Sequence, residues 1–83
     1  MDVRFEFNPS AFKHGATEAD IRHAYETMVY EAALAEFPDK YAVIGFDTRG
    51  NPLEILYNPM DGDTINVFHA MKVRGTFLAE LGL

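Results

Sequence analysis

The chain has 83 residues, of which 13 are Asp or Glu and seven are Lys or Arg, so its formal net charge is −6. Hydrophobic residues make up 48% of it, which excludes an intrinsically disordered chain. The acidic balance argues against a protein that coats nucleic acid through Lys and Arg. We expect a single domain over residues 1–83. The absence of cysteine fits a reducing cytoplasm, and the sequence predicts neither a signal peptide nor a membrane-spanning segment.

The N-terminal part predicts a strand followed by two helical segments. Residues 3–7, VRFEF, alternate apolar and charged side chains, as in a half-buried strand. A helical turn then begins at Pro9 and ends at Gly15, a residue suited to a left-handed C-terminal position. Thr17 and Asp20 have the spacing of a capping box, so a second helix begins there. Its apolar stripe comprises Ile21, Ala24, Tyr25 and Met28.

The sequence predicts that this helix ends between Met28 and Glu36, and it leaves open whether residues 29–37 are helix or strand. Residues 29–37 contain Ala, Leu and Glu, which favour helix, but Val29 and Tyr30 fit the start of a strand. Pro38-Asp39 predicts a turn after this segment.

Three further strands are predicted over residues 41–47, 52–58 and 64–73. The turn at 48–51 contains Gly50 and Asn51, which both suit a positive φ, and the turn at 59–63 contains an Asp-Gly pair. Because both connections are too short for a crossover, these strands should pair antiparallel.

Alternation along the last strand places His69 on the face of Ile65, Val67 and Met71. If that face is the core, His69 must be hydrogen-bonded or lie at the rim of the sheet. Residues 75–83 predict a short C-terminal helix, with an apolar face of Phe77, Leu78 and Leu81. The order of elements predicts an α+β fold, in which helices pack on one face of an antiparallel sheet of three to five strands.

Four segments together resemble the BrnT-type toxin family, whose fold is similar to that of the RelE ribonucleases. They are FEFNPS, KHG, TEADIRHA and HAMKVRG, and the most specific parts are residues 13–15, residues 69–71 and Arg74. The chain also resembles small uncharacterised bacterial proteins with the same KHG and HAM..R stretches. The resemblance implies a RelE-like fold, an endoribonuclease that acts without the ribosome, and a cognate antitoxin protein as partner.

Cleavage of RNA by its own 2′-hydroxyl requires a base, an acid and cations that stabilise the phosphorane. His14 and His69 titrate in the useful range and are the candidate acid and base. Lys13 and Arg74 are the candidate cations at the phosphate. Further cations expected to bind the substrate are Lys72 and Arg22. No metal or cofactor is expected, because the histidines lack i, i+4 spacing and the chain has no cysteine.

Two functions therefore stay open. The first is a toxin-like module, with RNA as substrate, and it requires His14 and His69 to converge in one open cleft. The second is a non-enzymatic domain on the same fold, which binds a protein partner or forms a homodimer. The net charge of −6 favours the second function, and the KHG and HAM stretches favour the first.

Overall fold

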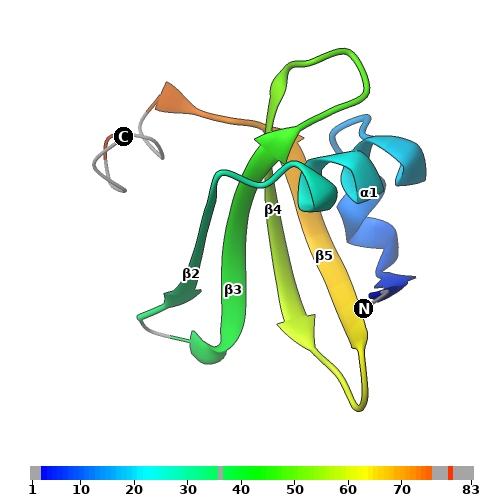
Figure 1. Cartoon of the computed structure of the whole chain (residues 1–83), viewed down its shortest axis with the longest axis vertical. Helices are drawn as coiled ribbons and strands as arrows, with labels where there is room; N and C mark the ends of the chain where they lie inside the picture. Colours follow the sequence, from blue (N-terminus) through cyan, green and yellow to red (C-terminus); the bar gives the residue numbers. More distant parts are fainter. Residues whose placement is uncertain (1–2, 36, 76–78, 80–83) are drawn as a thin grey trace.

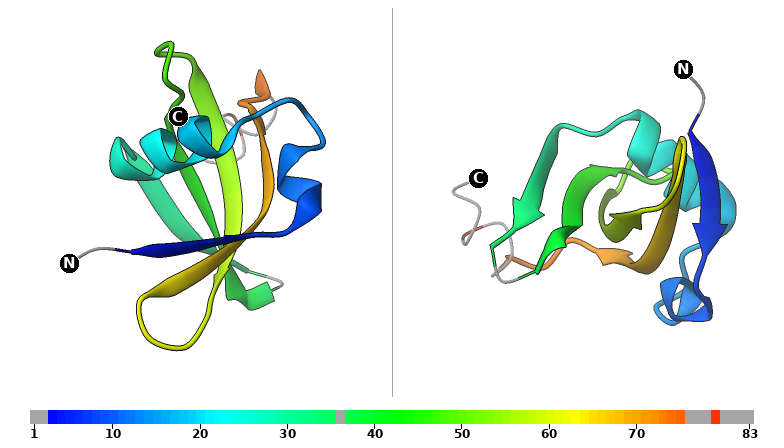
Figure 2. Two further views of the ribbon diagram at one scale, coloured as in Figure 1. Left: turned by 90° about the vertical axis from the view of Figure 1, so that its right-hand side faces the viewer. Right: turned by 90° about the horizontal axis from the view of Figure 1, so that it is seen from below.

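Five strands form one curved sheet in the order β1-β5-β4-β3-β2, and an α-helix packs on it (Figures 1 and 2). This computed structural model describes residues 3–35, 37–75 and 79. The α+β class expected from the sequence is confirmed. The elements are β1 (Arg4–Phe7), the 3₁₀ helix η1 (Pro9–Phe12), α1 (Glu18–Glu26), β2 (Tyr30–Leu34), β3 (Phe37–Phe46), β4 (Pro52–Pro59) and β5 (Thr64–Lys72).

The strand directions differ from the prediction at one edge. β2, β3, β4 and β5 pair antiparallel with their neighbours, as the short connections require. β1, however, runs parallel to β5, with Arg4 opposite Thr64 and Phe7 opposite Val67. The prediction of an entirely antiparallel sheet is therefore wrong. It rested on hairpin lengths, which say nothing about β1, because all the other elements lie between β1 and β5 in the chain.

The N-terminal capping pattern is confirmed. Asn8 caps η1 by accepting a hydrogen bond from the Ser10 amide at 3.0 Å, and Gly15 follows with a φ of 89°. The Thr17 hydroxyl accepts from the Asp20 amide at 3.1 Å, and the Asp20 carboxylate accepts from the Thr17 amide at 3.3 Å. This reciprocal pair is a complete capping box, so local sequence fixes where α1 begins.

The open segment at residues 29–37 contains strand β2, which forms the sheet edge opposite β1. The helix ends at Glu26, so the prediction that it ends between Met28 and Glu36 is wrong. The side chain of Thr27 then accepts a hydrogen bond from the amide of Phe46 at 3.0 Å, which holds the end of α1 to β3. Pairing with β3 thus decides a conformation that local propensity left open.

The turn predicted at Pro38-Asp39 is wrong, because β3 already begins at Phe37. The pairing with β2 jumps from Leu34 opposite Phe37 to Ala33 opposite Tyr41. Residues 38–40 therefore lie in a bulge without paired residues on β2. A proline, which has no amide hydrogen, is tolerated at such a position.

The core lies between α1 and one face of the sheet. Ile21 and Ala24 have no exposed surface and confirm the predicted apolar stripe, with Tyr25 and Met28 packed at its margin. The other buried members of the core are Ala11, Val43, Leu53, Ile55, Tyr57, Ile65, Val67 and Ala70. The predicted C-terminal helix falls largely outside the described residues. Within the described part of the chain, no helix is long and apolar enough to cross a membrane.

A bulge in β5 reverses the predicted side of one histidine. Leu56 pairs with His69 but Tyr57 pairs with Val67, so Phe68 is an extra residue in β5. As a result, Val67 lies in the core while His69 and Met71 lie on the opposite face of the sheet. The prediction that His69 shares a face with Ile65 and Val67 is wrong, because strict alternation does not survive an inserted residue.

The backbone of α1 lies very close to the sheet at Gly45 of β3. A Cβ atom added at Gly45 would overlap the carbonyl oxygen of Ala24. We expect Gly45→Ala to lower the free energy of unfolding by about 2 kcal/mol or more, because backbone would have to move. Urea denaturation measures this. Gly75→Ala is the control, since none of the residues that the structure describes lies within 4 Å of a Cβ there. Equal stability of the two variants would contradict the close packing.

Candidate functional site

The two candidate catalytic histidines meet at the surface. His14 follows η1 and His69 lies in β5, and their ring centroids are 5.6 Å apart with the rings inclined at 69°. The hydroxyl of Ser10 donates to the carbonyl oxygen of Phe68 at 2.5 Å, so η1 is held against β5. His14 is exposed, and the side chain of His69 is 21% exposed. Both imidazoles are therefore accessible from solvent.

Behind His69 lies Glu54, a carboxylate that sequence reasoning missed. Its side chain has no exposed surface, although β4 alternation places it on the polar side of the strand. Nε2 of His69 lies 3.0 Å from Oε2 of Glu54. Arg74 donates from its backbone amide (3.3 Å) and Nε (3.2 Å) to Oε1, and from Nη2 (3.0 Å) to Oε2. No local pattern marks Glu54, because His69 lies in β5 and Arg74 follows that strand, so both partners are distant from Glu54 in the sequence.

This arrangement fixes the tautomer of His69. An ionised carboxylate only accepts hydrogen bonds, so Nε2 of His69 must carry the proton that is donated to Glu54. In the neutral imidazole the other nitrogen, Nδ1, then carries the lone pair. The Arg74 guanidinium supplies the positive charge that a buried carboxylate needs. The four side chains thus form a continuous chain of contacts: Arg74 binds Glu54, Glu54 binds His69, and the His69 ring contacts the His14 ring.

The remaining candidate residues have different positions. Lys13 is exposed and precedes His14 at the C-terminal cap of η1. Arg22 lies on α1, where its guanidinium carbon is 4.9 Å from the centre of the Phe5 ring. Lys72 lines a pocket beside His14. The structure thus brings His14, His69 and Arg74 into one cluster and places Arg22 against β1 instead.

The third histidine belongs to the helix–sheet contact. Nδ1 of His23 donates to the carbonyl oxygen of Phe46 at 2.7 Å. Among the residues that the structure describes, no group of three His, Asp or Glu side chains is arranged to hold a metal ion.

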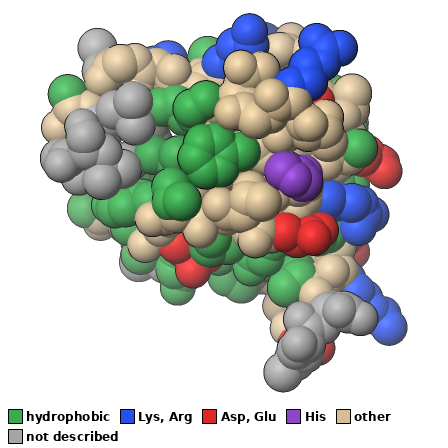
Figure 3. All heavy atoms as spheres, turned by 45° about the horizontal axis from the view of Figure 1, so that its top comes forward, with side chains coloured by type: hydrophobic (Ala, Val, Ile, Leu, Met, Phe, Trp, Pro, Cys, Tyr) green, Lys and Arg blue, Asp and Glu red, His purple; other side chains and the backbone are tan. Residues whose placement is uncertain are grey.

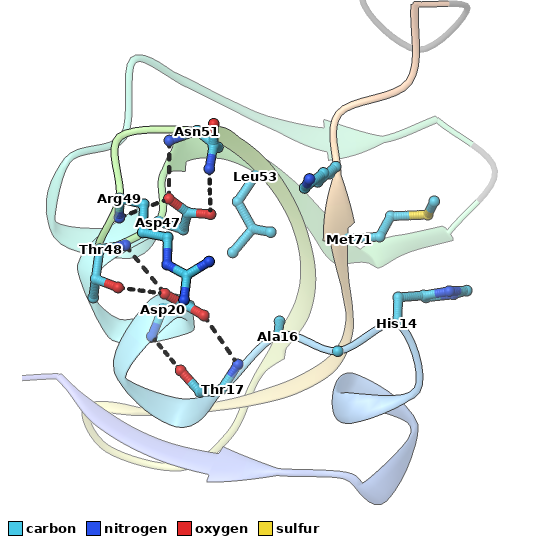
Figure 4. Close-up of a pocket in the computed structure, with 12 residues that line it drawn as sticks. His14, Ala16, Thr17, Asp20, Asp47, Thr48, Arg49, Asn51, Leu53 and Met71 are labelled. Carbon is cyan, nitrogen blue, oxygen red and sulfur yellow. Dashed lines mark hydrogen bonds between the residues drawn. The ribbon is translucent and has the colours of Figure 1, made fainter.

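A pocket of about 330 Å³ lies beside the loop that contains His14 (Figure 4). The loop at 14–17, the β3–β4 loop at 47–51 and the adjoining ends of β4 and β5 surround it. In Figure 4 the side chain of Leu53 points toward the pocket, whereas those of Met71 and His14 point away from it. The two loops line the pocket with polar side chains. The sequence predicted a turn at 48–51 and a break between two helical segments at Gly15, but no pattern indicated a pocket between them.

Asp20 joins the start of α1 to the β3–β4 loop. Its Oδ1 accepts from the amide (3.1 Å) and the hydroxyl (2.7 Å) of Thr48, while its Oδ2 accepts from Thr17. These bonds lower the pKa of Asp20 from 3.8 to about 2, and the bond from the Thr48 hydroxyl contributes most. The carboxylate therefore closes one wall of the pocket while it caps the helix.

Asp47 holds the β3–β4 loop in shape. Its Oδ1 accepts from the amides of Arg49 and Asn51, each at 2.9 Å. These bonds lower the pKa of Asp47, and the bond from the Asn51 amide contributes most. Gly50 has a φ of 85°, as predicted, but Asn51 does not have a positive φ. The prediction for Asn51 is wrong, because its amide and side chain bind Asp47 instead.

Positive charge on the surface is local. In Figure 3, Lys and Arg side chains lie along the upper edge and the right of the view, apart from the hydrophobic side chains on the left. Asp and Glu side chains lie beside the cations at the right of this view. No protein family, curated protein or solved structure matches this chain. Its function must be inferred from the site itself.

Glu54 is expected to be the most sensitive charged side chain of the domain. Glu54→Gln keeps the shape but removes the charge that pairs with Arg74 and His69. We expect it to lower the free energy of unfolding by about 1–3 kcal/mol, measured by urea denaturation at neutral pH. Glu6→Gln, on the exposed side of β1, is the matched control and should change little. A Glu54→Gln protein as stable as the wild type would show that the buried ion pairs do not form.

The lowered pKa of Asp20 predicts a specific dependence of stability on pH. A carboxylate with a depressed pKa contributes stability above its ordinary pKa of 3.8 and loses it as the pH falls through about 2. Asp20→Asn should therefore be less stable than the wild type at neutral pH, by less than about 1 kcal/mol because the group is largely solvated. The difference should shrink between these two pH values. Glu18→Gln, in the same helical turn, is the control. A stability difference that is independent of pH would contradict this account.

Proposed function

We propose that this chain is the toxin-like module of a bacterial type II toxin–antitoxin pair and acts as a metal-independent endoribonuclease. The observation that carries the proposal is the contact between His14 and His69, with Glu54 behind His69. Two imidazoles at this separation can contact the same phosphodiester group, and both reach solvent. A RelE-like fold, a cognate antitoxin as partner and a cytoplasmic location belong to the same proposal.

The proposed reaction begins with proton transfer to Nδ1 of His69, the nitrogen that faces away from Glu54. The proton comes from a ribose 2′-hydroxyl, whose oxygen attacks the adjacent phosphorus. The bond from phosphorus to the 5′-oxygen then breaks, and the His14 imidazolium donates a proton to the leaving oxygen. The products are a 2′,3′-cyclic phosphate and a free 5′-hydroxyl. This chemistry needs no metal, because the two histidines move both protons.

The cations of the site have separate roles in this proposal. Lys13, next to His14, stabilises the charge that develops on the phosphorane oxygens. Arg74 acts as a positioning residue, because its guanidinium binds the carboxylate that orients His69. Lys72 binds the substrate beside the pocket. Arg22 lies over the Phe5 and Phe7 rings, so it would contact RNA only where the strand passes β1.

A second candidate is a non-enzymatic domain that binds a protein partner or a second copy of itself. The net charge of −6 favours it, and so does Val29, whose side chain is 67% exposed beside the edge strand β2. In this case the Glu54 cluster would serve stability alone.

The test uses purified protein, single-stranded RNA and excess EDTA. We expect RNA fragments that end in 2′,3′-cyclic phosphate, detected by mass spectrometry. His14→Ala and His69→Ala should each lower the cleavage rate by about 10²–10⁴-fold. His23→Ala is the matched control and should cleave as the wild type does, because His23 contacts Phe46 and not the pair. Absence of cleavage by the folded wild type, or full activity of His14→Ala, would reject the nuclease in favour of the interaction domain.

A further inference from the structure

A phenylalanine precedes the proposed reaction centre on β5. Val67 is buried in the core, so alternation turns the next side chain, Phe68, to the face of the sheet that points away from α1. The bulge keeps His69 on that face as well. Both side chains are only partly buried. An accessible aromatic ring and a histidine of the pair therefore share one face of the sheet, as neighbours in the chain.

A lysine lies against this ring from across the sheet. Nζ of Lys40 is 5.3 Å from the centre of the Phe68 ring. Lys40 belongs to β3, and β4 lies between β3 and β5 (Figure 1), so the lysine side chain reaches across one strand. Tyr41, the next residue, packs on the core side, which places Lys40 on the face away from α1. Its contact with Phe68 agrees with that placement of both side chains.

Two amide side chains continue this face toward the turn between β4 and β5. Asn58 follows the core residue Tyr57, and Asn66 precedes the core residue Val67, so both amides point away from the core. Nδ2 of Asn66 donates to Oδ1 of Asn58 at 3.1 Å. Within the described part of the chain, Oδ1 of Asn66 accepts no hydrogen bond, so it can accept one from a ligand.

An aromatic ring, a cation and amides on one sheet face are the groups that bind single-stranded nucleic acid. Bases stack on the rings, and lysines bind the backbone phosphates. A base can displace the Lys40 ammonium from the Phe68 ring, because a solvated cation–ring contact is weak compared with base stacking. Glu6 of β1 lies on the same face, opposite Asn66. An anionic strand is therefore directed from the histidine pair toward Lys40 and away from Glu6.

We propose that the sheet face beside His69 binds single-stranded RNA, with one base stacked on Phe68 and a phosphate at Lys40. This inference rests on the proposed function, because the stacked base would belong to the nucleotide next to the bond that His14 and His69 cleave. A phenylalanine ring stacks on any base, so this surface positions the strand without selecting its sequence. The substrate is then an unpaired RNA segment, since a base inside a duplex has no free face for the ring.

The test measures the affinity for a 2′-O-methylated RNA of about six nucleotides by fluorescence anisotropy. This probe has no free 2′-hydroxyl, so the proposed reaction cannot cleave it. We expect Phe68→Leu to weaken binding about tenfold, because leucine fills the position but does not stack on a base. Phe68→Tyr is the matched control, which keeps the ring and should bind within about twofold of the wild type.

The lysine is tested by the dependence of this affinity on salt. Lys40→Gln should reduce the slope of log affinity against log salt concentration by about 0.7, the contribution of one phosphate contact on a single strand. Arg49→Gln is the control, because it removes a cation from the loop beside the pocket on the helix side of the sheet. It should leave the slope unchanged.

No binding of the probe, or equal binding by the wild type and Phe68→Leu, would overturn the inference. Because the probe is not cleaved, this result is independent of the nuclease test. Binding that depends on Phe68, without cleavage of ordinary RNA, would keep the RNA-binding face and reject the nuclease. Cleavage of ordinary RNA by Phe68→Leu with an unchanged kcat/KM would keep the nuclease and overturn the RNA-binding face.

Discussion

A carboxylate without exposed surface must find its hydrogen bonds inside the protein, and Glu54 finds them in Arg74 and His69. The same three residues connect the middle of β4 with the second half of β5 and the segment that follows it. The carboxylate also decides which nitrogen of His69 holds a proton, and so which nitrogen carries the lone pair. Stability of the sheet and chemistry at its surface therefore depend on one buried charge, whose desolvation is offset only while both partners stay in place.

Two backbone features place His69 and His14 near the Glu54 carboxylate. The extra residue Phe68 turns His69 away from the core and toward Glu54, and the hydrogen bond from Ser10 brings η1, and hence His14, to the same edge. On the other face, Gly45 allows α1 to approach the sheet closely enough to place Asp20 beside the β3–β4 loop. The pocket therefore lies on the helix side of the sheet, whereas His69 lies on the opposite face.

Much of the fold follows from local sequence. The capping box at Thr17 and the alternation in β1 and β4 predicted elements that the structure confirms, because neighbouring residues alone decide them. The conformation of β2 and the parallel pairing of β1 depend on strands distant in the chain, which no local pattern encodes. The candidate site divides in the same way. Its histidines were identified by type and resemblance, whereas Glu54 reads as an ordinary surface residue of an alternating strand until its distant partners are known.

The state of the His69 ring tests the central claim most directly. A long-range ¹H–¹⁵N NMR spectrum at a pH of about 8.5, where histidine is ordinarily neutral, distinguishes the two imidazole tautomers. The hydrogen bond to Glu54 predicts that His69 is protonated on Nε2 and that its Nδ1 carries the lone pair. Protonation on Nδ1, or rapid averaging of the two tautomers, would show that Glu54 does not hold this ring and would contradict the account.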